Sequence, residues 1–285
     1  MARGNSRSRK TPSEAEEILN TFVVDRVTEK LNEQAEKLSR KAEKYADKME
    51  ALGPALELWM RREPGARKPR FSRDDIAEAA VRIADEEGIE ALSMRRLATE
   101  LGAGTMTLYH YVRTKDELLS LLTDAVMSEL ILPPSKLRGS WRDAITAIAH
   151  SSRAALERHP WIFDIVDDPA VGPNGVRHFD QSWQAVSSLP GTFEQKLDVI
   201  HMVDEYVFGY VLHARNDFAA NDAEDPMRDY VAHLVSGGSY PSLAALIDEF
   251  GINALWRKMS SQARDPRRFD RNLSRLLDGV ERSLR

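Results

Sequence analysis

The stretch 101-LGAGTMTLYHYVRTK-115 collects two tyrosines, one histidine and three threonines, although aromatic residues make up only 7% of this chain of 285 residues. If the stretch is helical, Leu108 and Val112 lie one turn apart and face a core. The other faces carry Thr105, Thr107, Tyr109, His110 and Tyr111. Solvent exposure alone favours Lys and Glu at such positions, so these polar and aromatic side chains predict a binding surface.

The sequence before this stretch contains two helix starts. Ser72, followed three residues later by Asp75, is a capping box, and it predicts a helix that Gly88 ends. Ser93 caps a second, shorter helix, which Gly102 ends. Both helices place apolar residues on one face, as expected for packing against a core.

A third helix is predicted from Thr105, as its cap, to about Val112, and a longer one from Asp116 to Leu130. Two short helices separated by a Gly-containing turn form a helix-turn-helix unit, whose second helix enters the major groove of DNA. Hydroxyl and imidazole groups hydrogen-bond phosphates or base edges, while the Met106 thioether suits a thymine methyl group. The alternative is that the tyrosines only stabilise the small domain by packing.

The rest of the chain also predicts helices and no convincing strand, so the sequence predicts an all-α fold. Beyond residue 140, helices are expected at about 141–158, 160–166, 173–187, 192–218, 226–236, 241–261 with a possible break, and 266–284. We expect three parts along the chain. They are a basic arm, helical extension and linker over 1–66, a helix-turn-helix DNA-binding domain over 67–115, and a larger ligand-binding and dimerisation domain over 116–285.

The amino-terminal region predicts an extra helix. Residues 13–60 are rich in Glu, Lys, Ala and Leu and contain no Gly or Pro before Gly53. Apolar residues alternate by four and three along Leu31, Ala35, Leu38, Ala42, Tyr45, Met49 and Leu52. This pattern fits either an amphipathic helix lying against the protein or a coiled coil with a second copy.

Charge is unevenly distributed around the formal net charge of −5. Residues 1–60 are neutral, residues 61–115 carry +2 and residues 116–285 carry −7, so polyanion binding is expected only in the front part of the chain. The absence of Cys excludes disulfides and thiolate metal sites and suits a cytoplasmic protein. The sequence predicts no membrane helix, no signal peptide, no metal site and no cofactor.

Residues 71–118 resemble the DNA-binding domain of the TetR family of bacterial transcription repressors. The resemblance is carried by G-x-x-A-L-S-M-R-R-L-A from Gly88, by the following L-G, by T-L-Y-x-Y-V from Thr107 and by K-x-E-L-L from Lys115. The segments 158-RHPWI-162 and 172-GPNG-175, with the helix expected over 192–218, are similar to the C-terminal domain of the tetracycline-repressor-like branch.

The resemblance implies roles for individual side chains at the DNA. Arg95 would touch the backbone or a guanine, and Lys115 would hold a phosphate. The start of the recognition helix would sit over the bases with Thr105, Met106 and Thr107. Phosphates and sugars would be contacted by Tyr109, His110 and Tyr111. The tetracycline repressors have a glutamine-proline pair where this chain has Thr105-Met106, so the same docking mode is implied but not the same operator.

The last helix predicts a helix-packing surface. An apolar stripe runs along it through Phe269, Leu273, Leu276, Leu277, Val280 and Leu284. By similarity to the family, this helix over 266–284 would pair with the 192–218 helix, and both with their copies in a homodimer, as a four-helix bundle. The alternative is a terminal helix docked only on its own subunit.

A small-molecule site is expected among the aromatic residues of the C-terminal part. His201, Asp204 and Phe208 share one helical face, and Trp183 lies near the end of the preceding helix, so we name these four as candidate ligand-binding residues. A structural His–Asp pair is the alternative. No nucleophile elbow or metal cluster accompanies them, so we expect no catalytic residues.

The predicted function is that of a DNA-binding transcriptional repressor, released from a palindromic operator by a small-molecule effector of unknown identity. A helical protein-interaction scaffold, or an enzyme, is the alternative.

Overall fold

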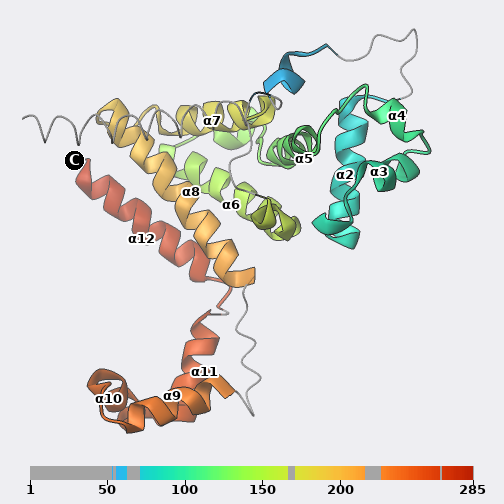
Figure 1. Cartoon of the computed structure of the whole chain (residues 1–285). Helices are drawn as coiled ribbons and strands as arrows, with labels where there is room; N and C mark the ends of the chain where they lie inside the picture. The colour runs from blue at the N-terminus through green and yellow to red at the C-terminus, as the bar shows by residue number, and fades with distance from the viewer. Residues whose placement is uncertain are drawn as a thin grey trace, which may run out of the picture. The chain divides into compact units, whose positions relative to one another are not determined.

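The computed structural model describes residues 53, 56–62, 71–165, 171–215, 226–263 and 265–284 (Figure 1). Every regular element within these ranges is a helix, so the all-α prediction is confirmed. The chain divides into one unit over Met1–Glu57 and another over Leu58–Arg285. The basic arm and nearly all of the helix predicted over 13–60 lie outside the described residues, and only 53 and 56–60 of that helix are seen as helical.

Local capping signals set the first helices, α2 (Arg73–Glu87) and α3 (Met94–Glu100). The Ser72 hydroxyl accepts a hydrogen bond of 3.1 Å from the Asp75 backbone N–H, and the Asp75 carboxylate accepts one of 2.7 Å from the Ser72 N–H. Gly88 ends α2 at a φ of 85°, in the left-handed region that favours glycine. These boundaries agree with the sequence prediction.

The predicted third helix is shorter than expected. Helix α4 covers only Thr105–Leu108, and its N-cap is Gly104, so the prediction that Thr105 caps a helix to Val112 is wrong. After Leu108 the chain tightens into a turn in which the Tyr111 N–H bonds to the Leu108 carbonyl three residues earlier.

The residues just before the linker pack against these helices. The Leu58 side chain is fully buried in the same core as Ile76, Leu97 and Leu108. The Arg73 guanidinium donates a 3.0 Å hydrogen bond to the Arg61 carbonyl, which ties the two segments together. The helix-turn-helix region therefore includes a piece of chain whose Arg61 lies 12 residues before the first residue of α2.

The middle of the chain forms the main helical core (Figure 1). Apolar residues of α5, α6 and α8 fill it, including Leu122, Ile148 and Val203. The Leu122 side chain is fully buried, and those of Ile148 and Val203 are each 1% exposed. The elements are α5 (Lys115–Glu129), η2 (Pro134–Leu137), α6 (Trp141–Arg158), η3 (Pro160–Asp164), α7 (Pro173–Val186) and α8 (Phe193–Arg215).

The last four helices form two groups. The first group contains α9 (Pro226–Ser236), α10 (Pro241–Phe250) and α11 (Ile252–Ala263), which contact one another. Gly251, at a φ of 74°, makes the predicted break between α10 and α11. Helix α12 (Arg268–Ser283) packs on α8 (Figure 1).

The apolar stripe of α12 is used largely within its own subunit. Phe269, Leu273, Leu277 and Val280 are buried in the shared core, with Phe269 fully covered. The Tyr206 hydroxyl on α8 donates a 2.9 Å hydrogen bond to the Phe269 carbonyl. The predicted pairing of the terminal helix with the 192–218 helix is confirmed within one chain.

Candidate DNA interface and ligand site

The outward face of α4 carries side chains that suit a DNA groove. Met106 is 75% exposed and Tyr109 is 41% exposed, and Thr107 and His110 are also exposed. Thr105, at the first position of the helix, is half-buried. Leu108 is fully buried and holds the short helix against the core. A large apolar side chain left in solvent beside hydroxyl and imidazole groups is expected at a binding surface.

Tyr111 is a correction to the sequence prediction, which placed its side chain outward. The Tyr111 side chain is only 5% exposed, and its ring lies 5.5 Å from the Phe71 ring. Helix α4 ends at Leu108, and in the tight turn that follows the Tyr111 N–H bonds to the Leu108 carbonyl, so Tyr111 does not continue the outward face of the helix. Tyr111 therefore stabilises the small core from within.

The two neighbouring arginines of α3 have different surroundings. The Arg96 guanidinium lies 2.6 Å from Glu87 and 2.9 Å from Glu100, and these carboxylates raise its pKa further. The Arg95 side chain is exposed and forms no ion pair within the described residues. Arg95 is therefore available for a phosphate or a base, whereas Arg96 stabilises the helix-turn-helix unit.

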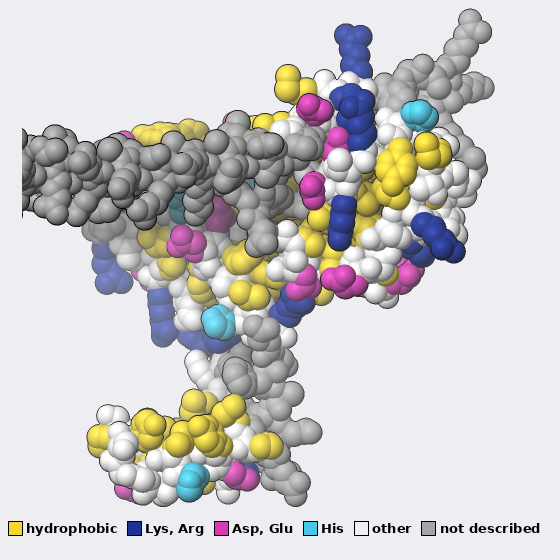
Figure 2. All heavy atoms as spheres, viewed as in Figure 1, with side chains coloured by type: hydrophobic (Ala, Val, Ile, Leu, Met, Phe, Trp, Pro, Cys, Tyr) yellow, Lys and Arg dark blue, Asp and Glu magenta, His cyan; other side chains and the backbone are white. Residues whose placement is uncertain are grey.

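Lys115 lies at the first position of α5, beyond the recognition segment, by which we mean Thr105–Val112, and its side chain is exposed. On the face shown in Figure 2, Lys and Arg side chains are scattered among Asp and Glu side chains and do not gather into one patch.

An ion pair that the sequence analysis missed holds the end of the recognition segment in place. The Arg61 guanidinium donates hydrogen bonds of 3.1 and 2.8 Å to the two oxygens of Glu117 and one of 3.0 Å to the Tyr111 carbonyl. The Glu117 side chain is 2% exposed and that of Arg61 is 17% exposed.

Hydrogen bonding keeps the buried carboxylate charged. Burial acts to raise the pKa of the Glu117 carboxyl, but the hydrogen bonds from Arg61 and from the Arg113 backbone N–H hold it below its usual value. The pair joins residues 56 positions apart, and no periodic pattern in the sequence signals it.

The four candidate ligand-binding residues do not form one cluster. The Trp183 ring lies 5.0 Å from Phe193 at the start of α8, and the Phe208 ring lies 4.6 Å from Phe163 of η3. Because Phe193 and Phe208 are 15 residues apart on one helix, the two pairs are separated by roughly 22 Å along its axis. His201 and Asp204 lie between them with exposed side chains.

Asp204 is the most perturbed of these groups. Its carboxyl is open to solvent on one side but surrounded by protein on the others, and this burial raises its pKa to about 6, against the opposing charge of His201. This carboxyl group, whose pKa is raised toward neutrality, lies close to the Phe163–Phe208 ring pair. Together they form a surface that suits a polar aromatic ligand.

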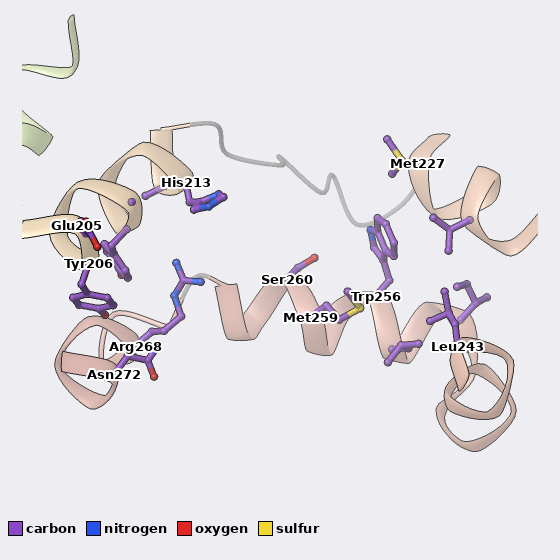
Figure 3. A pocket seen from close by; sticks show the side chains of 16 residues that line it. Glu205, Tyr206, His213, Met227, Leu243, Trp256, Met259, Ser260, Arg268 and Asn272 are labelled. Carbon is purple, nitrogen blue, oxygen red and sulfur yellow. The ribbon is translucent and has the colours of Figure 1, made fainter. Parts of the chain in front are cut away.

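A separate cavity of about 950 Å³ lies on another side of α8 and α12. Figure 3 shows Tyr206 and His213 of α8 and Arg268 of α12 on one side of this cavity, with Trp256 and Met259 of α11 on the other. None of the four candidate ligand-binding residues lines it.

Helix α5 is tied to the start of α7 by a buried carboxylate. Asp124 accepts hydrogen bonds from the backbone N–H groups of Asn174 and Gly175, at 2.9 and 3.2 Å, and another from the Asn174 side chain. Gly172 is required there, because a Cβ would come within 2.3 Å of an Asp124 oxygen. The 172-GPNG-175 segment is thus a joint between two helices of the C-terminal part.

Comparison with known proteins gives the family. The profile described as bacterial regulatory proteins, tetR family, matches residues 76–122. The profile described as tetracyclin repressor-like, C-terminal domain, matches residues 133–284, which is more than half of the chain. The chain belongs to the tetR family.

Named relatives of this tetR-family chain are regulators. HTH-type transcriptional repressor DrrR1 of Streptomyces coeruleorubidus is 36% identical over 234 residues, covering 78% of this chain and 81% of the relative. An HTH-type transcriptional regulator of Saccharopolyspora erythraea is 34% identical over 190 residues, covering 66% of this chain and 80% of the relative. The tetR-family chain is therefore a DNA-binding transcriptional regulator and not an enzyme.

A solved structure supports the same assignment. The TetR family protein ActR of Streptomyces coelicolor, crystallised in complex with actinorhodin, matches with a TM-score of 0.57 at 26% identity, covering 76% of this chain and 99% of that one. Within the described part of the tetR-family chain, no helix is long and apolar enough to cross a lipid bilayer.

Proposed function

We propose that this tetR-family regulator is a repressor that binds a near-palindromic operator as a homodimer and is released by a small-molecule effector. The observation that carries the proposal is the exposed face of α4, where Met106, Thr107, Tyr109 and His110 stand out beside Arg95 and Lys115. The relatives named as repressors support the direction of regulation.

The contacts divide into those that select sequence and those that position the protein. Thr105, Met106 and Thr107 face the base edges at the start of α4, where hydroxyl groups and a thioether distinguish base pairs. Arg95, Tyr109, His110 and Lys115 bind phosphates and sugars on either side of the groove. Tyr111 acts only from inside the core, since its ring is buried.

The homodimer forms through the helices α8 and α12, and the cavity of Figure 3 receives part of the second copy. Helices α9 to α11 support this, because among their described side chains only Val235 and Leu255 are buried. Their large exposed apolar residues are Met227, Tyr230, Tyr240, Leu246, Phe250 and Met259. Such a surface needs a partner to remove it from water.

The effector site is the surface around His201, Asp204 and Phe208, with Phe163 as the opposing ring. Trp183, the fourth candidate, is expected to act at a distance from it, through its packing on Phe193. That ActR was crystallised with actinorhodin supports a small-molecule ligand for this protein as well. Its chemical identity in this protein is a matter for screening.

Release from DNA follows if the effector binds the two conformations of the protein unequally. A filled site moves α8 and α7, and the Asp124 joint carries this displacement into α5, which begins beside the recognition segment. A difference of about 1.4 kcal/mol between the two states changes operator affinity tenfold.

The test begins with duplexes selected by the full-length protein from random DNA. Replacing Lys115 or Tyr109 with Ala should weaken binding to all selected duplexes by a similar factor and reduce its salt dependence. Replacing Thr105 or Met106 with Ala should change which base pairs are preferred. Arg95→Ala should also weaken binding, and Arg96→Lys is its control, because a lysine keeps the positive charge beside Glu87 and Glu100.

The scaffold alternative makes the opposite prediction. If the full-length protein enriches no duplex at low salt, or if all of these variants bind as the wild type does, the repressor proposal is wrong.

A further inference from the structure

A buried histidine connects the DNA-binding helices to the C-terminal helices. His159 ends α6, and its side chain is 2% exposed. Its Nδ1 lies 2.7 Å from an oxygen of Asp85 on α2, and its Nε2 lies 3.2 Å from an oxygen of Glu129 at the end of α5. One imidazole ring therefore bridges three helices.

A second donor from the same segment reinforces the contact. The Trp161 indole N–H donates a 2.7 Å hydrogen bond to the same Asp85 oxygen, and the Trp161 side chain is 5% exposed. The His159 and Trp161 rings lie 5.7 Å apart, so both belong to one packed unit at the turn between α6 and η3. Asp85 is the only member on α2, and its carboxylate is 29% exposed.

The hydrogen bonds of His159 have a defined donor and acceptor. Ionised carboxylates only accept hydrogen bonds, so each imidazole nitrogen facing one must donate. A ring carrying both N–H groups satisfies Asp85 and Glu129 together, and Arg158 pairs with Glu129 from the adjacent position. The imidazole is 2% exposed, whereas the carboxylates of Asp85 and Glu129 are 29% and 32% exposed. Two charge-assisted hydrogen bonds from one buried ring fix its orientation between the two helices.

We propose that Asp85, His159 and Trp161 form the joint through which the C-terminal helices set the position of α2, and with it the recognition segment. These residues are positioning residues: they lie away from the α4 face and touch no base. The inference rests on the proposed function for its consequence at DNA, but the joint itself is a property of the protein alone.

The joint differs from the α5 route described above. Helix α5 connects the two parts along the chain, whereas His159 connects α6 directly to α2 across a sequence separation of 74 residues. Helix α2 already packs on α5, and the His159 contact adds a direct link from the C-terminal end of α2 to α6. A displacement of the turn between α6 and η3 is then transmitted to α2 without passing through α5.

The first experiment measures the joint without DNA. Because the chain has no Cys, spin labels attach only at introduced ones, and Glu78→Cys on α2 with Ala154→Cys on α6 places two labels at exposed positions. Labelled subunits are mixed with an excess of unlabelled protein, so that only distances within one subunit are recorded. The wild type should give one narrow distance distribution.

Three variants break the joint to different degrees. Asp85→Asn removes the charge, Trp161→Phe removes the indole N–H but keeps the ring, and His159→Gln removes the bridge. Each should broaden the distribution, with His159→Gln the broadest. The control is His150→Gln on the same helix, because His150 is 46% exposed and contacts Asp270 of α12 instead of α2. It should leave the distribution unchanged.

The second experiment measures the consequence at a duplex selected by the wild type. Asp85→Asn and His159→Gln should each weaken binding roughly tenfold, within the range of known couplings between sites. The double variant should bind the duplex as tightly as the single variant of lower affinity, because the effects of two substitutions that break the same contact do not add. Thermal unfolding of Asp85→Asn and Trp161→Phe, whose fold we expect to be retained, separates loss of folding from loss of the joint.

Two results would overturn the joint. One is an unchanged distance distribution in both Asp85→Asn and His159→Gln, and the other is full additivity of the two substitutions at the duplex. If the wild type selects no duplex, the proposed function fails, while the distance measurement still decides whether the joint exists.

Discussion

The helices α2 to α4 and the helices α9 to α11 differ in how far they bury their apolar side chains. The first group completes its core inside one chain, with Ile76, Leu97 and Leu108 fully buried. The second group, of three helices as well, buries only Val235 and Leu255 among its described side chains. It leaves six large apolar residues open.

The comparison shows what each region depends on. The core of α2 to α4 is filled, and polar contacts at its border, such as the pair between Arg61 before α2 and Glu117 of α5, add to its stability. In α9 to α11 the missing apolar contacts must come from outside the chain, and a second copy is the partner we propose. Substitutions in the first region should therefore change folding stability, and those in the second should change assembly.

The largest effect is expected at Arg61, at the border of the first region. Arg61→Ala leaves the Glu117 carboxylate buried without its cation, which should lower the free energy of unfolding by about 3 kcal/mol or more. Chemical denaturation of the full-length protein at pH 7 measures this. Arg62→Ala is the matched control, since Arg62 is exposed.

The pH dependence sharpens the Arg61 prediction. A carboxyl whose pKa is lowered on folding adds stability above its unfolded pKa, here 4.5, and loses it as the pH falls. The difference between wild type and Arg61→Ala should therefore shrink as the pH falls below 4.5 and through the lowered pKa of folded Glu117. An equal difference at pH 7 and pH 3.5 would show that packing of the Arg61 stem, and not the charge, is responsible.

The next effect tests the second region through assembly. Met259→Asp places a charge where a 55% exposed methionine lines the cavity, and it should weaken the homodimer about tenfold or more, as for a buried interface residue. Sedimentation at several concentrations measures it. Ser261→Asp, two positions away and exposed outside the cavity lining, is the control. Equal behaviour of the two variants would remove α9 to α11 from the dimer interface.

A smaller effect returns to the first region. Ser72→Ala removes the cap of α2 and should cost about 1 kcal/mol of stability, because an N–H of the first turn loses its acceptor. Ser128→Ala on α5 is the control, since its hydroxyl bonds only to a carbonyl within its own helix. If Ser72→Ala lowered the free energy of unfolding more than Arg61→Ala, local caps would contribute more to stability than long-range contacts, against this prediction.

The smallest effect lies on the open face of α8. Asp204→Asn removes a carboxyl whose pKa is raised on folding to about 6, so the wild type loses stability as the pH rises from 3.8 through about 6. After solvent screening of this exposed group, the variant should be more stable at pH 7 by only about 0.5 kcal/mol. Thermal unfolding at pH 4 and pH 7 measures the gain, with Asp198→Asn on the same helix as control.

Much of the fold could be predicted because its signals are local. Ser72, Gly88, Ser93 and the proline and glycine positions set helix ends through contacts within a few residues, and the observed boundaries follow them. The exposed side chains of the recognition segment could be named for the same reason. Tyr111 was misplaced because the prediction extended a regular helix through a segment that ends it at Leu108.

The contacts that connect the parts could not be predicted. Arg61 and Glu117 are 56 residues apart, and His159 and Asp85 are 74 apart, so neither pair leaves a periodic pattern. Likewise, the α12 stripe predicted a packing surface, but only the structure shows that α8 of the same chain covers most of it.

The sequence alone determined where most helices begin and end and which short segment is predicted to meet DNA, since backbone capping and side-chain periodicity act over one or two turns. The tertiary structure decided which charges are buried together, which of the two α3 arginines is held in ion pairs and which helices leave apolar side chains exposed. Those outcomes depend on contacts between residues that are far apart in the sequence. The free energy of burying a charge or an apolar face arises only when the folded chain brings such residues together.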